Sequence, residues 1–69
     1  MAQTNKKKLE ILLGYWIEHN KEHSAEFKEW AEKAKRFTDA SLQKELLTAA
    51  SQLDKATRDL ESALAKLKA

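Results

Sequence analysis

The residues of this chain that could do chemistry gather in one short stretch of its first half. His19 and His23 stand four residues apart, so their imidazoles lie one above the other if the stretch is helical. Glu22 and Glu26 stand beside them at the same spacing. Imidazoles with neighbouring carboxylates are ligands that Zn²⁺, Ni²⁺, Co²⁺ and Cu²⁺ accept. The stretch therefore predicts a metal site made of His19, His23, Glu22 and Glu26.

The same two histidines also have a structural interpretation, which we prefer. His23 falls between Trp16 and Phe27 on an apolar stripe, where a histidine packs in a core or an interface. His19 lies at the edge of that stripe, where it would be half-exposed. The chain lacks the His-Glu-x-x-His motif and the Glu-x-x-His pairs of di-iron bundles. Metal binding is therefore the alternative, and no other cofactor is expected.

Nothing in the sequence supports nucleophilic catalysis or phosphate chemistry. The chain has no cysteine, and its serines lie in helical sequence without a histidine and an acid in the order of a triad. Gly14 is the only glycine, so a glycine-rich phosphate loop is excluded. We expect a protein that is not an enzyme.

The elements that position these residues are predicted to be helices. The chain of 69 residues has one glycine and no proline, and Ala, Leu, Lys and Glu dominate it, which favours an all-α fold.

Charge and hydropathy limit the partners that we expect. A net charge of +2 makes a nucleic-acid partner a weak expectation, and no apolar run approaches the ~20 residues of a membrane span. A cysteine-free chain suits the reducing cytoplasm, where we expect the protein to be. Residues 1–8, with Lys6, Lys7 and Lys8, are expected to form a basic, frayed start.

Both halves of the chain carry a set of mostly apolar residues at alternating steps of four and three. In the first half these are Leu9, Leu13, Trp16, Asn20, His23, Phe27, Trp30, Ala34 and Phe37. In the second half they are Leu42, Leu46, Ala49, Leu53, Ala56, Leu60, Ala63 and Leu67. Such steps form the a/d seam of helices that pack along one another, and a short connection makes neighbours antiparallel. We predict a single domain over 9–69, with a helix over 9–37, a turn over 38–41 and a helix over 42–67.

A hairpin folded at residue 39 or 40 brings large side chains of the first helix to small ones of the second. This match supports the hairpin, because an interdigitating core requires it. The four expected pairs are Phe37 with Leu42, Trp30 with Ala49, His23 with Ala56 and Trp16 with Ala63.

The apolar stripe of the first helix spans roughly 160°, which is wider than one partner helix can cover. We favour two hairpins that associate into a four-helix bundle. The alternative is a three-helix bundle within one chain, with a break between residues 14 and 24. In the dimer, Asn20 would fix the register. The expected interface residues are Trp16, Ile17, Asn20, Phe27 and Trp30.

The stretch from Leu12 to His23 reads Leu-Leu-Gly-Tyr-Trp-Ile-Glu-His-Asn-Lys-Glu-His, and Phe27 and Trp30-Ala31-Glu32-Lys33-Ala34 follow it. It resembles a small prokaryotic family of uncharacterised helical domains whose core reads approximately Leu-Leu-Pro-His-Trp-Ile-Glu-His-Asn-x-Glu-His. The resemblance covers about the first half of the chain and implies a helical hairpin of unknown function. Gly14 replaces the proline of that core and suggests that the helix begins or bends there. Tyr15 replaces its first histidine, which weakens the metal interpretation.

The leading interpretation is a non-enzymatic helical module that acts by association, with a second copy of itself or with another protein. The alternative is a metal-binding or metal-handling protein that uses the two histidines.

Overall fold

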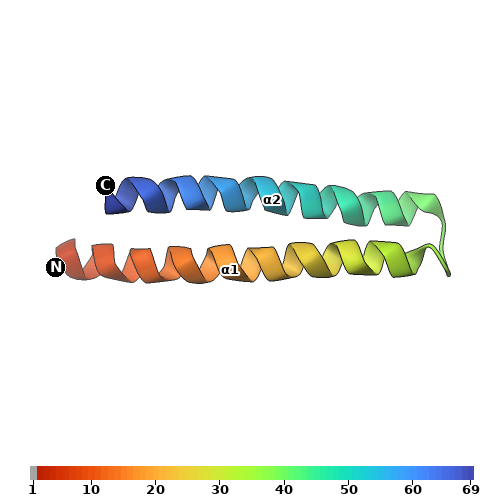
Figure 1. Cartoon of the computed structure of the whole chain (residues 1–69), viewed down its shortest axis with the longest axis horizontal. Coiled ribbons are helices and arrows are strands. Elements are labelled where there is room, and N and C mark those ends of the chain that lie inside the picture. The colour runs from red at the N-terminus through yellow and green to blue at the C-terminus, as the bar shows by residue number, and fades with distance from the viewer. Residues whose placement is uncertain (1) are drawn as a thin grey trace.

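The computed structural model describes residues 2–69 and consists of two long helices joined by a short turn (Figure 1). Helix α1 spans Ala2–Ala34 and helix α2 spans Ala40–Lys68. They lie side by side and antiparallel, so the two ends of the chain meet at one end of a rod that measures 52 × 14 × 13 Å. Residues 2–69 contain no strand. The predicted all-α helical hairpin is confirmed.

The turn between the helices is set by local hydrogen bonds. The carbonyl of Ala34 accepts hydrogen bonds from the backbone N–H groups of Phe37 and Thr38, at 3.2 and 3.0 Å, which closes the end of α1. Asp39 then adopts an extended conformation, and its carboxylate accepts a hydrogen bond from the N–H of Leu42 at 3.2 Å. Aspartate is among the best N-cap residues, because it satisfies an N–H that the helix itself leaves unpaired. Asp39 therefore starts α2 two residues earlier than predicted.

The first helix also differs from the prediction at both ends. It begins at Ala2 rather than at residue 9, so Lys6, Lys7 and Lys8 are part of the helix. An ion pair one turn apart, between Lys7 and Glu10 at 3.8 Å, favours this. The start of α1 extends past the end of α2 (Figure 1). Part of the predicted basic start, Met1, lies outside the described residues. Helix α1 ends at Ala34 rather than at residue 37, so the connection covers residues 35–39 rather than 38–41.

The alternative of a three-helix bundle is wrong. Helix α1 runs without interruption through Gly14 and through the whole interval from residue 14 to residue 24. Gly14 does not use a positive φ, and the strong helix formers Leu12 and Leu13 precede it. One glycine inside a helix costs only about 1 kcal/mol relative to alanine, which is too little to break so long an element.

The two helices face each other along a seam that is shifted by one residue from the predicted one. Its fully buried members are Leu13, Ile17, Ser24, Ala31 and Ala34 on α1 with Ala50 and Thr57 on α2. Its half-buried members are Asn20, Phe27, Leu46, Leu53, Leu60, Leu64 and Leu67. The alternation of four and three is confirmed, but on both helices every second seam position is the residue after the predicted one. Ile17, Ser24 and Ala31 are buried where Trp16, His23 and Trp30 were expected. On α2 the seam contains Ala50, Thr57 and Leu64 where Ala49, Ala56 and Ala63 were expected.

Side-chain size explains the shift. The axes of two helices packed against each other lie about 8–10 Å apart. The indoles of Trp16 and Trp30 are too large for that space on α1, whereas Ala31, Ala34 and Ala50 allow the helices to approach closely. The buried hydroxyls are also satisfied, since Thr57 donates a hydrogen bond to the Leu53 carbonyl at 2.8 Å. Because Ala31 occupies the seam in its place, Trp30 lies outside the seam and keeps 53% of its surface exposed.

Candidate functional site: the two flanks and the histidine pair

The seam leaves two long flanks, one on each side of the hairpin, and their chemistry is opposite. The residues that come directly before alternate seam residues form one flank, which we call the apolar flank. Its members are Leu9, Trp16, His23, Trp30 and Phe37 on α1 with Leu42, Ala49, Ala56 and Ala63 on α2. In an antiparallel pair these positions of both helices lie on the same side of the seam. The other side, which contains Lys21, Lys28, Asp54 and Glu61, is called the charged flank.

The charged flank is bridged by contacts between the helices, and a hollow of about 410 Å³ lies beside them, lined in part by Ile17, Glu61 and Leu64. Lys21 pairs with Glu61 at 3.3 Å, and Lys28 pairs with Asp54 at 3.2 Å. The buried Ser24 hydroxyl donates a hydrogen bond of 2.6 Å to the other oxygen of Asp54. These partners hold the pKa of Asp54 below its usual value, the Ser24 hydrogen bond most of all and Lys28 next.

The same contacts fix the register of the hairpin. A chain folded at residue 39 or 40 places Ser24 opposite residue 55, and the structure pairs Ser24 with Asp54. The predicted register is therefore correct to within one residue, although the seam was not. Sequence reasoning missed the charged flank, which could have been found from the lysines at 21, 28 and 35 and the acids at 54 and 61, all at seven-residue spacing.

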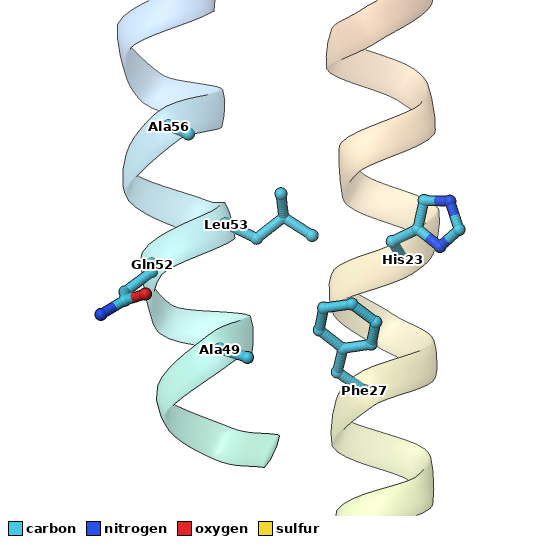
Figure 2. Close-up of a pocket in the computed structure, with 6 residues that line it drawn as sticks. All are labelled: His23, Phe27, Ala49, Gln52, Leu53 and Ala56. Atoms are coloured by element: carbon cyan, nitrogen blue, oxygen red, sulfur yellow. The ribbon is translucent and has the colours of Figure 1, made fainter. Parts of the chain in front are cut away.

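The apolar flank is open. An open hollow of about 570 Å³ lies along it and is lined by His23, Phe27, Ala49, Gln52, Leu53 and Ala56. In Figure 2, Phe27 and Leu53 point into the space between the helices, and the two alanines leave α2 without a side-chain ridge. Because His23 and Ala56 line the same hollow, the expected neighbourhood of these two residues is confirmed.

Large and small side chains divide this flank between the two helices. On α1, Trp16, Trp30 and Phe37 stand exposed, by 40% in the case of Trp16 and 69% in that of Phe37. On α2 three of the four positions are alanine. The flank therefore consists of an aromatic ridge on α1 beside an alanine groove on α2.

The predicted interface residues are split by the structure. Ile17 is 7% exposed and is covered by α2 of its own hairpin, so it is not available to another chain. Asn20 and Phe27 are half-buried in the seam. Trp16 and Trp30 remain exposed on the apolar flank.

Four rings one turn apart form a ladder on α1, and the histidine pair is its centre. Tyr15 stacks on His19 with ring centroids 5.5 Å apart, and Phe27 follows His23 at 6.1 Å. The imidazoles of His19 and His23 meet edge to face at 4.4 Å, with their Nε2 atoms 2.9 Å apart. The predicted proximity of the two histidines is confirmed.

The carboxylates behave differently from the prediction. Glu26 lies 3.2 Å from Nδ1 of His23, on the side of the ring that faces away from His19. Glu22 is exposed. Among residues 2–69, no group of three or more His, Cys, Asp or Glu side chains is arranged to hold a metal ion. The four-residue ligand set is therefore not assembled in the described part of the chain.

The Glu26 contact is compatible with one arrangement of the ring protons. With its proton on Nδ1, on the side of Glu26, His23 has an acceptor lone pair on Nε2. His19 then donates its Nε2–H across the short Nε2–Nε2 contact.

Comparison with known proteins adds a family without a described activity. No curated protein and no solved structure matches this chain. Neither helix described over residues 2–69 combines the length and the hydropathy needed to cross a membrane. Residues 9–67 match a family described as a domain of unknown function (DUF8180), and because this match spans most of the chain, the chain belongs to that family.

Proposed function

We propose that this chain is a non-enzymatic association module and that its apolar flank packs against the same flank of a second copy. One observation carries the proposal. The aromatic ridge and the alanine groove lie exposed side by side, while ion pairs bridge the two helices on the opposite flank. The proposal places the module in the cytoplasm, which the cysteine-free composition favours.

The exposed area supports a partner of this size. The hairpin exposes 5392 Å². A typical monomer of 7.9 kDa exposes about 4,400 Å², so this chain exposes about 1,000 Å² more than its mass requires. A standard interface covers about 800 Å² on each partner. One interface along the flank would remove most of the excess.

Symmetry explains why a second copy of the chain would fit against the apolar flank. Rotation by half a turn about an axis parallel to the helices places α1 of one copy over α2 of the other and keeps every residue at its own height along the rod. Trp30 has Ala49 at its height within one hairpin, and Trp16 has Ala63. The second copy's Trp30 then also lies at the height of Ala49, over the groove. The aromatic ridge of each copy therefore lies over the alanine groove of the other copy, with large side chains opposite small ones.

The resulting assembly is a four-helix bundle in which every adjacent pair of helices is antiparallel. An axis perpendicular to the helices would instead stack the aromatic ridge of one copy on the ridge of the other and leave both grooves empty. Close packing favours the first arrangement.

The test replaces one alanine of the groove with a charge. Ala56 is exposed in the hairpin, so Ala56→Glu should leave the monomer folded. It would bury an unpaired carboxylate in the dimer, which costs several kcal/mol. Sedimentation velocity at tens of micromolar should show a dimer for wild type and a monomer for Ala56→Glu, with unchanged helical circular dichroism.

Ala25→Glu is the matched control, because Ala25 is an equally exposed alanine on the outer face of α1. This variant should remain dimeric. A monomeric wild type would contradict the proposal and leave another protein as the occupant of the flank. Equal dimerisation of both variants would show that the copies associate through some other surface.

A further inference from the structure

We propose that His19 and His23 form a two-imidazole clamp for one divalent transition-metal ion with tetragonal or octahedral preference, such as Ni²⁺ or Cu²⁺, and that Glu26 orients the clamp. This site needs only side chains of α1, although one of its ligands, His23, also belongs to the apolar flank. The chain has two histidines in all, and both belong to it.

The separation of the two nitrogens selects the class of metal. At metal–nitrogen distances of about 2.05 Å, nitrogens 2.9 Å apart subtend an angle of about 90° at the ion. That is the angle between adjacent ligands in square-planar and octahedral geometry. A tetrahedral ion such as Zn²⁺ requires a separation of about 3.3 Å. The clamp therefore fits Cu²⁺ and Ni²⁺ better than Zn²⁺.

The neighbours of the pair prepare it for a metal. Glu26 lies 3.2 Å from Nδ1 of His23, a position that favours the tautomer with its proton on Nδ1 and its lone pair on Nε2, toward His19. A carboxylate behind a ligating histidine fixes the tautomer and raises the basicity of the ligand. Tyr15 stacks on His19 at an interplanar angle of 13° and restrains the second ring. Binding of an ion would release the Nε2 proton of His19, because a ligating nitrogen needs its lone pair.

The site is accessible and its surroundings are acidic. The side chain of His23 is 44% exposed, and in Figure 2 its ring points away from α2. Glu18 and Glu22 lie on neighbouring exposed positions of the same helix and attract a cation without being placed as ligands. With two protein ligands, the remaining coordination positions belong to water or to a small ligand that arrives with the ion.

Isothermal titration of tag-free protein with NiCl₂ and with ZnCl₂ tests the clamp. Wild type should bind one Ni²⁺ per chain, and more tightly than Zn²⁺. His19→Ala leaves one imidazole and should weaken Ni²⁺ binding at least tenfold. Glu26→Gln should weaken it about tenfold, as loss of an outer-shell partner does. Glu22→Gln is the matched control and should change it less than twofold.

Three results would overturn the clamp: no heat of Ni²⁺ binding at 100 micromolar, tighter binding of Zn²⁺ than of Ni²⁺, or equal effects of Glu26→Gln and Glu22→Gln. A further titration shows whether Ni²⁺ binding depends on dimerisation. Ala56→Glu should still bind one Ni²⁺ per chain as a monomer. If that variant loses Ni²⁺ binding, the ligands come from two copies and the clamp within one chain is wrong.

Discussion

Asp54 is the side chain that does most to tie the two helices together on the charged flank. Its two oxygens accept hydrogen bonds from Ser24 and Lys28, so one carboxylate satisfies a buried hydroxyl and pairs with a cation. Ser24 is only 3% exposed, and without this partner its hydroxyl would need to turn to the helix backbone, as the hydroxyl of Thr57 does. Buried polar groups cost free energy unless they are paired, so this contact helps to select the seam that is observed.

The lowered pKa of Asp54 predicts a dependence of stability on acid. Because the carboxylate is favoured in the folded state, its contribution is fully present above pH 4 and is lost as the pH falls through the lowered pKa. Asp54→Asn should lower the urea midpoint at pH 7, and its midpoint should fall less steeply than that of wild type between pH 4 and pH 2. Asp59→Asn, on an exposed position of α2, should follow wild type. Parallel curves for all three proteins would contradict the role given to Asp54.

At the scale of the helices, the wide stripe of α1 has two edges with different surroundings. One edge of it, with Ile17, Ser24 and Ala31, packs against α2. The other edge, with Trp16 and Trp30, lies open on the apolar flank. A helix in a four-helix bundle needs both edges, because it has two adjacent helices.

The helices, their antiparallel order and their register could be predicted from steps of four and three and from a four-residue connection. The buried column could not. Hydrophobicity favours the column with Trp16 and Trp30, whereas the space between two close helices admits only the smaller Ile17 and Ala31. A periodicity argument weighs apolar character and does not measure that space.

For the candidate site, helical spacing was enough to bring His19 and His23 together. The same spacing places Glu26 three residues after His23 and Glu22 three residues after His19, so each carboxylate had a histidine within reach. The structure selects Glu26. That choice turns a predicted ligand into an outer partner of the ring.

Gly14 tests the continuity of α1. A Cβ added at this position meets nothing within 4 Å, and the residue is exposed inside a regular helix. Gly14→Ala should therefore raise the free energy of unfolding by about 1 kcal/mol, because alanine restricts the unfolded chain and favours the helix. Ala25→Gly should lower it by a similar amount. Chemical denaturation measures both, and a loss of stability in Gly14→Ala would mean that the helix bends at residue 14.

At the scale of the whole molecule, the hairpin is a thin rod with a small core. Its fully buried apolar residues are Leu13, Ile17, Ala31, Ala34 and Ala50, and three of these are alanine. A core of this size contributes little hydrophobic stabilisation, and small domains commonly gain the rest by oligomerisation. Packing two apolar flanks together would cover the tryptophans, which carry the largest apolar surfaces of the chain.

The most direct measurement of this dimer is an isotope-filtered nuclear Overhauser experiment on a mixture of labelled and unlabelled chains. The filter retains only contacts between copies, which matters because Trp30 has Ala49 at its own height within one hairpin as well. The dimer predicts contacts between copies from the Trp30 indole to the Ala49 methyl and from Trp16 to Ala63. Contacts between copies that join Trp16 to Trp30, ridge to ridge, or no contacts between copies at millimolar concentration, would contradict it.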